Sequence, residues 1–292
     1  MSNLVRSPLN HIGNKFRILP ELLDIIPSPE ICNDYFFIDV FGGSFNVGIN
    51  SGFKNIIFNE KDKELFNIIN FFIKNEFKHI DNLIKEKVNK YSLITQKDYK
   101  KNNIGYKKLR DDYNHYNRDI VSLIVLVFFS FNSEIRFNSK GQFNVPIGKS
   151  GYSDYRRKNL ELFSQLVKNR NIKLYNEDFE DFVLKIIKKL DPEKIIFYFD
   201  PPYLVSQAPY NSTWSIADEN RLISIFKILD DKGIKFVASN FLKNGNNINT
   251  VLKKFIEDRS INVKKLNISY KNSNYHRKNK EVEEIIFWNY EQ

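Results

Sequence analysis

Short apolar runs that end abruptly at polar residues most constrain how this chain can fold. The run Ile195–Phe199 is apolar throughout and then meets an aspartate and two prolines, and Glu284–Trp288 is almost as continuous. Strands of this kind are typical of sheets that helices cover on both faces. The other candidate strands are Phe36–Val40, Asn55–Asn59, Ile172–Tyr175, Ile234–Ser239 and Ile261–Ile268.

Helical segments separate these strands. Gly42–Asn50 opens a helix between the first two strands, and Asp62–Ile73 has the apolar spacing of a second one. With 292 residues and 42% hydrophobic content, the chain is long enough for one large domain or for a core domain with an insertion. We predict an α/β fold with a Rossmann-like, doubly wound, mostly parallel sheet.

The pattern changes between residues 76 and 164, where lysine-rich helical segments replace the strands. The apolar run Ile120–Phe131 is shorter than the ~20 residues that span a bilayer, so we expect a buried helix. This stretch holds 17 Lys and Arg against 10 Asp and Glu. Its net charge is therefore most of the chain's formal charge of +10. We therefore predict a core domain of residues 1–75 and 165–292 with an inserted basic helical domain of residues 76–164, and a polyanionic partner.

The single cysteine, Cys32, excludes an internal disulfide and any multi-cysteine zinc site. We expect a cytoplasmic protein without a metal. Residues 1–17 lack the apolar stretch of a secretory signal, and we expect no membrane partner.

Two features predict a cofactor that contains adenosine. Asp39-Val-Phe-Gly-Gly43 places glycines where a strand turns into a helix, and Glu60 follows Gly43 by 17 residues, near the position of the ribose-binding acid in nucleotide folds. A tight turn and a solvated acid at a strand end would account for the same residues. No G-x-G-x-x-G and no phosphate-loop motif is present, which disfavours NAD, FAD and ATP hydrolysis.

The segment Asp200-Pro-Pro-Tyr203 follows a buried strand, and strand ends are where open α/β folds bind ligands. Proline has no amide donor, so Asp200 and the neighbouring carbonyls form a set of acceptors suited to an amino group. Tyr203 offers a ring on which a base could stack, worth roughly 1–3 kcal/mol. A Pro-Pro turn with a packing role is the alternative.

Four blocks resemble, in this order, the Dam-type DNA adenine-N6 methyltransferases: Asn10-His-Ile-Gly-Asn-Lys15, Asp39–Gly43, Arg136–Gly148 and Asp200–Tyr203. The resemblance implies S-adenosylmethionine as cofactor, double-stranded DNA as substrate, and residues 76–164 as a target-recognition domain. It also implies methyl transfer to the N6 amino group of an adenine that is flipped out of the duplex. The family's first motif often has Trp or Tyr where this chain has His11, and its glycine loop often has a further glycine where this chain has Phe45.

The resemblance also assigns roles to individual residues. It implies Glu60 as the ribose acid, Asp178 as the acid that meets the cofactor's adenine, and an acceptor role for the Pro201 carbonyl beside Asp200. Tyr210, Asn211 and Trp214 are candidates to line the base pocket. The catalytic set is Asp200, Pro201, Pro202 and Tyr203; the cofactor set is Lys15, Asp39, Phe41, Gly42, Gly43, Glu60 and Asp178; the nucleic-acid set is Asn10, Arg136, Asn138, Lys140, Arg156, Arg157, Lys271, Arg277 and Lys278.

Other readings stay open. Adenine in structured RNA and a glutamine amide in a protein also present an amino nitrogen, and a catalytically idle nucleic-acid-binding module could keep the same fold. A restriction-modification system or a phage is a candidate context, with a cognate restriction endonuclease as a possible partner, and we expect a monomer. The DNA target sequence cannot be deduced from the residues, because base contacts depend on which few side chains enter the groove.

Overall fold

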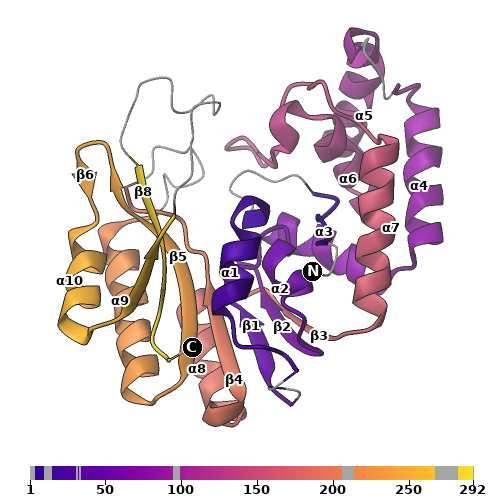
Figure 1. The fold of residues 1–292 in the computed structure, drawn as a ribbon. Coiled ribbons are helices and arrows are strands. Elements are labelled where there is room, and N and C mark those ends of the chain that lie inside the picture. Colours follow the sequence, from indigo (N-terminus) through magenta and orange to yellow (C-terminus); the bar gives the residue numbers. More distant parts are fainter. Residues whose placement is uncertain are drawn as a thin grey trace. The chain divides into compact units, whose positions relative to one another are not determined.

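Two units make up the fold in the computed structural model (Figure 1). The structure describes residues 4–9, 15–30, 32, 34–94, 99–205, 214–266 and 282–291. The first unit comprises Met1–Ile18, Gly43–Asn50 and Glu60–Asn176, and the second comprises Leu19–Gly42, Ser51–Asn59 and Glu177–Gln292. Each unit is therefore assembled from separate stretches of the chain.

The sheet of the second unit is parallel at its centre and antiparallel towards one edge. Its strands run in the order β2-β1-β4-β5-β8-β7, and β6 pairs with β5. Strand β1 pairs in parallel with β2 and with β4, β4 pairs in parallel with β5, and β8 is antiparallel to β5 and β7. The prediction of an α/β fold with a mostly parallel sheet is confirmed. The strands are β1 (Phe36–Asp39), β2 (Asn55–Asn59), β4 (Ile195–Phe199), β5 (Lys235–Asn244), β6 (Asn247–Ile248), β7 (Asn262–Lys265) and β8 (Val282–Trp288).

Helices cover this sheet on both sides. Helices α9 and α10 lie on one side of β5 and β8, and α1 lies on the other (Figure 1). Phenylalanine rings fill the layer under α9, where the Phe226 ring centroid lies 4.9 Å from that of Phe236 and 5.4 Å from that of Phe287. The helices are α1 (Leu19–Ile25), α8 (Phe179–Lys189), α9 (Ile216–Asp231) and α10 (Thr250–Arg259).

Strand β5 runs further than its predicted end at Ser239. It continues to Asn244 through an irregularity between Phe241 and Lys243, where its pairing with β8 shifts register. Apolar content falls after Phe241, so the sequence pattern marked an earlier end, and pairing with β8 and β6 holds the polar extension in place. A β-bulge of this kind re-aims side chains beside a site.

The first unit is helical and packs around α6 (Ile120–Phe129). Every residue of α6 after Ile120 is buried, and α6 contacts α3, α4 and α5. Asp119 begins the helix by accepting the N–H of Ser122 at 2.8 Å. The predicted buried helix is therefore present. The unit's other elements are α2 (Asn46–Asn50), α3 (Lys63–Lys74), α4 (Phe77–Lys90), α5 (Asn103–His115), α7 (Asp154–Lys168), β3 (Asn171–Tyr175) and the short 3-10 turns Lys15–Arg17, Tyr99–Asn102 and Phe131–Ser133.

The limits of this unit differ from the predicted insertion. Residues 60–75 and 165–176 belong to the same unit as residues 76–164. The assignment of 76–164 to a target-recognition domain stays a prediction. Among helices of the described residues, none combines the length and apolar character that crossing a membrane takes.

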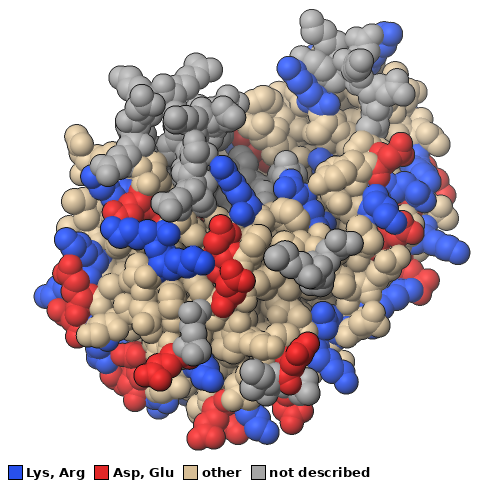
Figure 2. Space-filling view, viewed as in Figure 1, with Lys and Arg blue, Asp and Glu red and all other residues tan. Residues whose placement is uncertain are grey.

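Charge on the visible face is mixed. Figure 2 shows Lys and Arg side chains interspersed with Asp and Glu, with uncharged surface between them. On this face, the excess of positive charge does not form one continuous field. An anion-binding site on this protein would therefore depend on individual residues and cavities.

Candidate active site

Two predicted motifs lie at the same edge of the sheet in the second unit. Asp39 is the last residue of β1 and pairs in register with Tyr198 of the neighbouring parallel strand β4. Asp200 follows β4 directly. Strand order reverses between β1 and β4, because β1 is followed on its other side by β2. Open α/β sheets bind ligands at such a reversal, beyond the carboxyl ends of the strands.

The Asp200 carboxylate is held by hydroxyl groups. Its Oδ1 accepts a hydrogen bond from the Ser239 hydroxyl at 3.0 Å and one from the Tyr203 hydroxyl at 3.1 Å. Ser239 comes from β5, so two neighbouring strands fix one carboxylate. Pro201 is buried and Pro202 half-buried beside it. The expected set of acceptors is present, but it has side-chain donors that the sequence reasoning did not foresee.

Tyr203 corrects the expectation of an open stacking face. Its side chain is 6% exposed, and its ring centroid lies 4.6 Å from that of Phe241 with the planes tilted by 51°. A buried tyrosine hydroxyl needs a hydrogen-bond partner, and here Asp200 and Glu284 are both within reach. Burial, together with these two carboxylates, raises the pKa of Tyr203 well above its usual value. The hydroxyl therefore keeps its proton and acts as a donor within the wall of the site.

Glu284 was not among the predicted site residues. It lies on β8, is 3% exposed, and its Oε1 is 3.3 Å from the Tyr203 hydroxyl. The sequence did carry a signal, because an acid opens the otherwise apolar run Glu284–Trp288. An acid on a buried strand needs polar partners, and the strand's neighbours supply them only in the folded state.

An aromatic cluster surrounds Phe41, which was assigned to the cofactor. Its ring centroid lies 5.4 Å from that of Phe179 and 5.9 Å from that of Trp214. The indole N–H of Trp214 donates to Glu219 at 2.8 Å, and the amide of Asn249 donates to the same carboxylate at 2.6 Å. Glu219 is fully buried, and burial raises its pKa. Trp214 is therefore fixed beside Phe41, whereas Tyr210 and Asn211 lie outside the described residues.

The two glycines of the loop have different physical requirements. A Cβ on Gly42 would lie 2.0 Å from the ring of Phe58, so that position has no room for a side chain. Gly43 has φ 53°, a left-handed conformation that glycine adopts without strain. Gly42 is thus needed for packing and Gly43 for backbone geometry. These two requirements explain the glycines without a ligand.

Within the first unit, Gly43 and Glu60 are in direct contact. The Gly43 N–H donates to Glu60 Oε2 at 2.9 Å, and the Asp62 N–H donates to Oε1 at 2.8 Å. Burial raises the pKa of Glu60 to about 7, although these two N–H donors act in the opposite direction. A hydrogen-bond donor from a ligand would favour the ionised form of this half-buried carboxylate and so lower its pKa.

Three further residues singled out in the sequence have local roles. Lys15 begins a short 3-10 turn and is half-buried. Asp178 caps α8 by accepting the Glu180 N–H at 3.1 Å and also pairs with Arg221, so the structure gives it protein partners. Phe45 has φ 63° and a fully buried ring 6.2 Å from that of Phe163. The bulky residue therefore occupies a left-handed conformation and compensates by packing.

The predicted DNA-contacting residues around position 140 form a tight hairpin. The Asn138 side chain accepts the backbone N–H groups of Lys140 and Gln142, each at 3.0 Å. Arg136 donates from Nε to the Asn144 side chain at 3.0 Å and remains exposed. Lys140 is exposed at the turn. The structure thus presents Arg136 and Lys140 to solvent and uses Asn138 to build the turn.

Arg156 and Arg157 are neighbours with opposite surroundings. Arg157 donates to both oxygens of Asp81 at 3.0 Å, and Asp81 on α4 also accepts from Lys85. Arg156 is only 8% exposed and has its guanidinium 4.3 Å from the Phe128 ring centroid. Arg156 is therefore buried, whereas the Arg157 side chain stays partly exposed beside Asp81, and the contact of both residues with DNA stays a prediction. Asn10, Lys271, Arg277 and Lys278 lie outside the described residues.

Comparison with known proteins gives a family match along most of the chain. The family model described as "D12 class N6 adenine-specific DNA methyltransferase" matches residues 11–283. A protein named "Modification methylase StsI" from Streptococcus sanguinis is 31% identical over 98% of the chain and 43% of its own length. "Type II methyltransferase M.FokI" from Planomicrobium okeanokoites is 29% identical over 99% of the chain and 43% of its own length. A "DNA adenine methylase" from Haemophilus influenzae is 26% identical over 80% of the chain and 78% of its own length.

The lengths of these relatives differ. The chain spans less than half the length of the first two relatives and most of the length of the third. What the longer proteins do as wholes is therefore not carried over with the match.

Proposed function

Because the chain belongs to the D12 class N6 adenine-specific DNA methyltransferase family, we propose that it methylates the N6 amino group of adenine in double-stranded DNA. The observation that carries this proposal is the position of Asp39 and Asp200 at the ends of two neighbouring parallel strands, on either side of the reversal in strand order. That geometry provides for two ligands at one sheet edge.

The residues fit S-adenosylmethionine as the cofactor. In the second unit, Phe41 and Trp214 offer apolar ring surface beside the end of β1. In the first unit, Glu60 offers a carboxylate that could accept ribose hydroxyls. We assign Asp39, Phe41 and Gly42 to the methionine side and Gly43 and Glu60 to the ribose. When bound, the cofactor supplies an electrophilic methyl group.

Asp200 has the central role in the transfer. The lone pair of the adenine amine is delocalised into the ring, so the amine is a weak nucleophile. Hydrogen bonds from the two N6–H groups to Asp200 and to the Pro201 carbonyl would orient the nitrogen and stabilise the positive charge it gains. With the cofactor bound, the nitrogen would form its bond to the methyl carbon as the sulfur–carbon bond breaks, and one N6 proton would then leave to solvent. The hydroxyls of Ser239 and Tyr203 hold the carboxylate in a fixed orientation throughout.

The base must leave the duplex to reach this site. Inside the helix the amine is paired, and extruding it costs a few kcal/mol. With Tyr203 buried, the stacking partner for the base must come from elsewhere, and Trp214 next to the segment 206–213 is the described aromatic candidate. We propose a cognate restriction endonuclease as a partner, because two relatives are named as a modification methylase and a type II methyltransferase. The monomeric state stays a prediction from the sequence.

The test is a methyl-transfer assay with competing substrates. The full chain is incubated with labelled S-adenosylmethionine and equal amounts of duplex DNA, structured RNA and a glutamine-rich protein. We expect label in DNA, recovered as N6-methyladenine by mass spectrometry. Label in RNA or protein alone would replace the substrate in this proposal, and binding of cofactor without transfer to any of the three would favour an idle module.

A further inference from the structure

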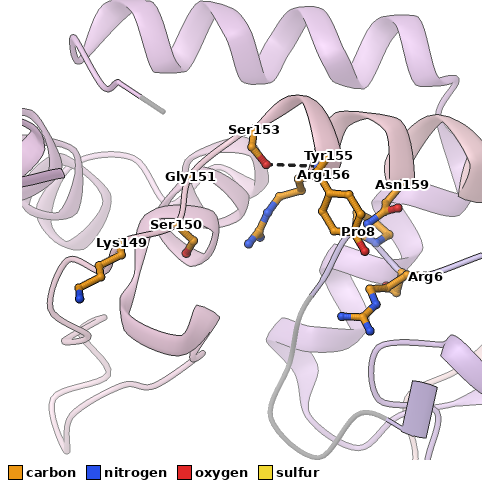
Figure 3. Close-up of a pocket in the computed structure, with 10 residues that line it drawn as sticks. Arg6, Pro8, Lys149, Ser150, Gly151, Ser153, Tyr155, Arg156 and Asn159 are labelled. Carbon is orange, nitrogen blue, oxygen red and sulfur yellow. Dashed lines mark hydrogen bonds between the residues drawn. The ribbon is translucent and has the colours of Figure 1, made fainter. Parts of the chain in front are cut away.

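A cationic cavity lies within the first unit. Its volume is about 410 Å³, within the range of ligand-sized pockets. It opens between the segment Arg6–Pro8 and the start of α7 (Figure 3). Three of its lining side chains are cations and none is an acid. The residues that line it are Arg6, Ser7, Pro8, Lys149, Ser150, Gly151, Ser153, Tyr155, Arg156 and Asn159.

Arg156 is the unusual member of this set. It is 8% exposed, its Nη2 donates to the Ser133 hydroxyl at 3.2 Å, and its Nη1 is buried without a hydrogen-bond partner. Within the described residues, no carboxylate pairs with it. Burial lowers the pKa of Arg156 to about 10. A buried cation without an anion is costly, so the site is electrostatically incomplete as it stands.

The Arg156 side chain extends into the cavity, where a ligand could contact its guanidinium group. Figure 3 shows the Arg156 side chain extending from α7 into the space that Lys149 and Arg6 border from other segments. The guanidinium carbon of Arg156 lies 4.3 Å from the centroid of the Phe128 ring, a cation–π contact that helps to fix the side chain. Lys149 is exposed and Arg6 half-buried, so both can move to meet an anion at the mouth.

The backbone around the cavity adds to its positive potential. Helix α7 has 15 residues and begins here, with the Ser153 hydroxyl accepting the Arg156 N–H at 3.3 Å. The amino end of a helix attracts anions through its oriented peptide dipoles. Asp154 in the first turn weakens this effect, but it is not among the residues that line the cavity.

We propose that this cavity binds one phosphate group of the DNA backbone, with Arg156 at its floor and Arg6 and Lys149 at its mouth. The inference rests on the proposed function, since that function supplies the polyanion. A planar guanidinium donates two parallel hydrogen bonds to a phosphate, which a lone surface lysine cannot do. The contact positions the duplex without reading its sequence.

The first experiment measures how DNA binding depends on salt. Each phosphate that a protein neutralises contributes about 0.9 to the slope of log affinity against log salt. Because Arg6, Lys149 and Arg156 would share one phosphate, Arg6→Gln, Lys149→Gln and their combination should lower the slope, and the loss in the double variant should not exceed about 0.9. Two separate contacts would give about twice that loss in the double variant and would overturn the proposal.

The second experiment identifies the phosphate. Duplexes carry one neutral methylphosphonate at successive backbone positions. One position should weaken binding by wild type about tenfold and weaken binding by the double variant clearly less, because Arg156 alone keeps only part of the same interaction. Absence of any such coupled position would overturn the proposal. Competition by inorganic phosphate without a coupled position would assign the cavity to free phosphate and would also overturn it.

Controls separate folding and function from the site. Lys232→Gln with Lys254→Gln removes the same charge from exposed positions of the second unit and should leave the slope unchanged. Arg156→Met keeps a long side chain over Phe128 and should lower DNA affinity further than the double variant does. Thermal unfolding reports whether Arg156→Met folds, and the variants of Arg6 and Lys149 decide the outcome if it does not. Methylation of DNA by wild type with unchanged slopes in the variants would reject this site alone, whereas failure of wild type to bind DNA would reject the proposed function.

Discussion

The two units bury charged groups in contrasting ways. In the second unit, the described partners of Asp200 Oδ1 are hydroxyls, and Glu219 is held by an indole and an amide. In the first unit, Asp81 accepts hydrogen bonds from Arg157, Lys85 and the Tyr152 hydroxyl, whereas among the described residues no carboxylate pairs with Arg156. The Asp200 carboxylate in the second unit suits a ligand that donates hydrogen bonds or gains positive charge. The Arg156 guanidinium in the first unit suits an anion. Electrostatic complementarity, more than total charge, separates the two sites.

The largest expected effect tests the acidic side of this contrast. Asp200→Ala should lower the rate of methyl transfer about a thousandfold, because the amine loses its orienting acceptor. Affinity for S-adenosylmethionine, measured by calorimetry, should stay within about threefold, since the assigned cofactor residues are elsewhere. A rate within tenfold of wild type would remove Asp200 from the centre of the site.

The second effect concerns how the carboxylate is held. Tyr203→Phe removes one donor to Asp200 and should reduce kcat about ten- to thirtyfold, with little change in the KM for cofactor. Because the pKa of Tyr203 lies well above its usual value, the pH–rate profile should keep its shape and only move down. A loss confined to thermal stability would make Tyr203 a packing residue only, whereas a changed profile would show that its hydroxyl affects a group that titrates in the reaction.

The third effect distinguishes the two adjacent arginines. Arg157→Gln breaks its contacts with Asp81 and should lower the free energy of unfolding by about 1–2 kcal/mol, less than for a fully buried pair because Lys85 and solvent remain. The salt slope of DNA binding should not change. Lys158→Gln, an exposed neighbour, serves as the control in denaturant titrations. A lower slope in Arg157→Gln would return this residue to the DNA-binding set.

The smallest effect is a pH dependence at Glu60. The pKa of Glu60 is raised to about 7, so its protonated form contributes to the free energy of unfolding. This contribution is complete below about pH 4.5 and is lost as the pH rises through 7. Ribose hydroxyls donate to the ionised form, so cofactor affinity should increase about tenfold from pH 6 to pH 8. Calorimetry in buffers of different ionisation enthalpy should detect proton release on binding. Glu60→Gln should remove both signals, and an unchanged pH dependence in that variant would assign the titration to another group.

Local patterns in the sequence were sufficient for most of the second unit's fold. The apolar runs located β2 and β4 at the observed residues. These signals work because a strand is specified by residues close together in the chain. The same reasoning placed Gly43 and Glu60 together as one loop-and-acid motif, and the two are hydrogen-bonded.

Contacts between distant residues were not predictable in this way. Glu284 reaches Tyr203 across 81 positions, and Arg157 reaches Asp81 across 76. No local pattern reports which buried polar group will meet which partner, because the pairing depends on how strands and helices pack. For that reason Tyr203 was expected to offer its ring to a base, whereas the ring packs against Phe241.

By itself, then, the sequence determined the order of strands and helices, the turn residues at the sheet edge and the family to which they belong. Only the tertiary structure decided which charged side chains are satisfied within the protein and which await a ligand. The physical reason is that burial multiplies the cost of an unpaired charge, and burial is a property of the packed molecule. Arg156 and Arg157 are adjacent in the chain and identical in chemistry, yet the fold gives an acid to one of them only.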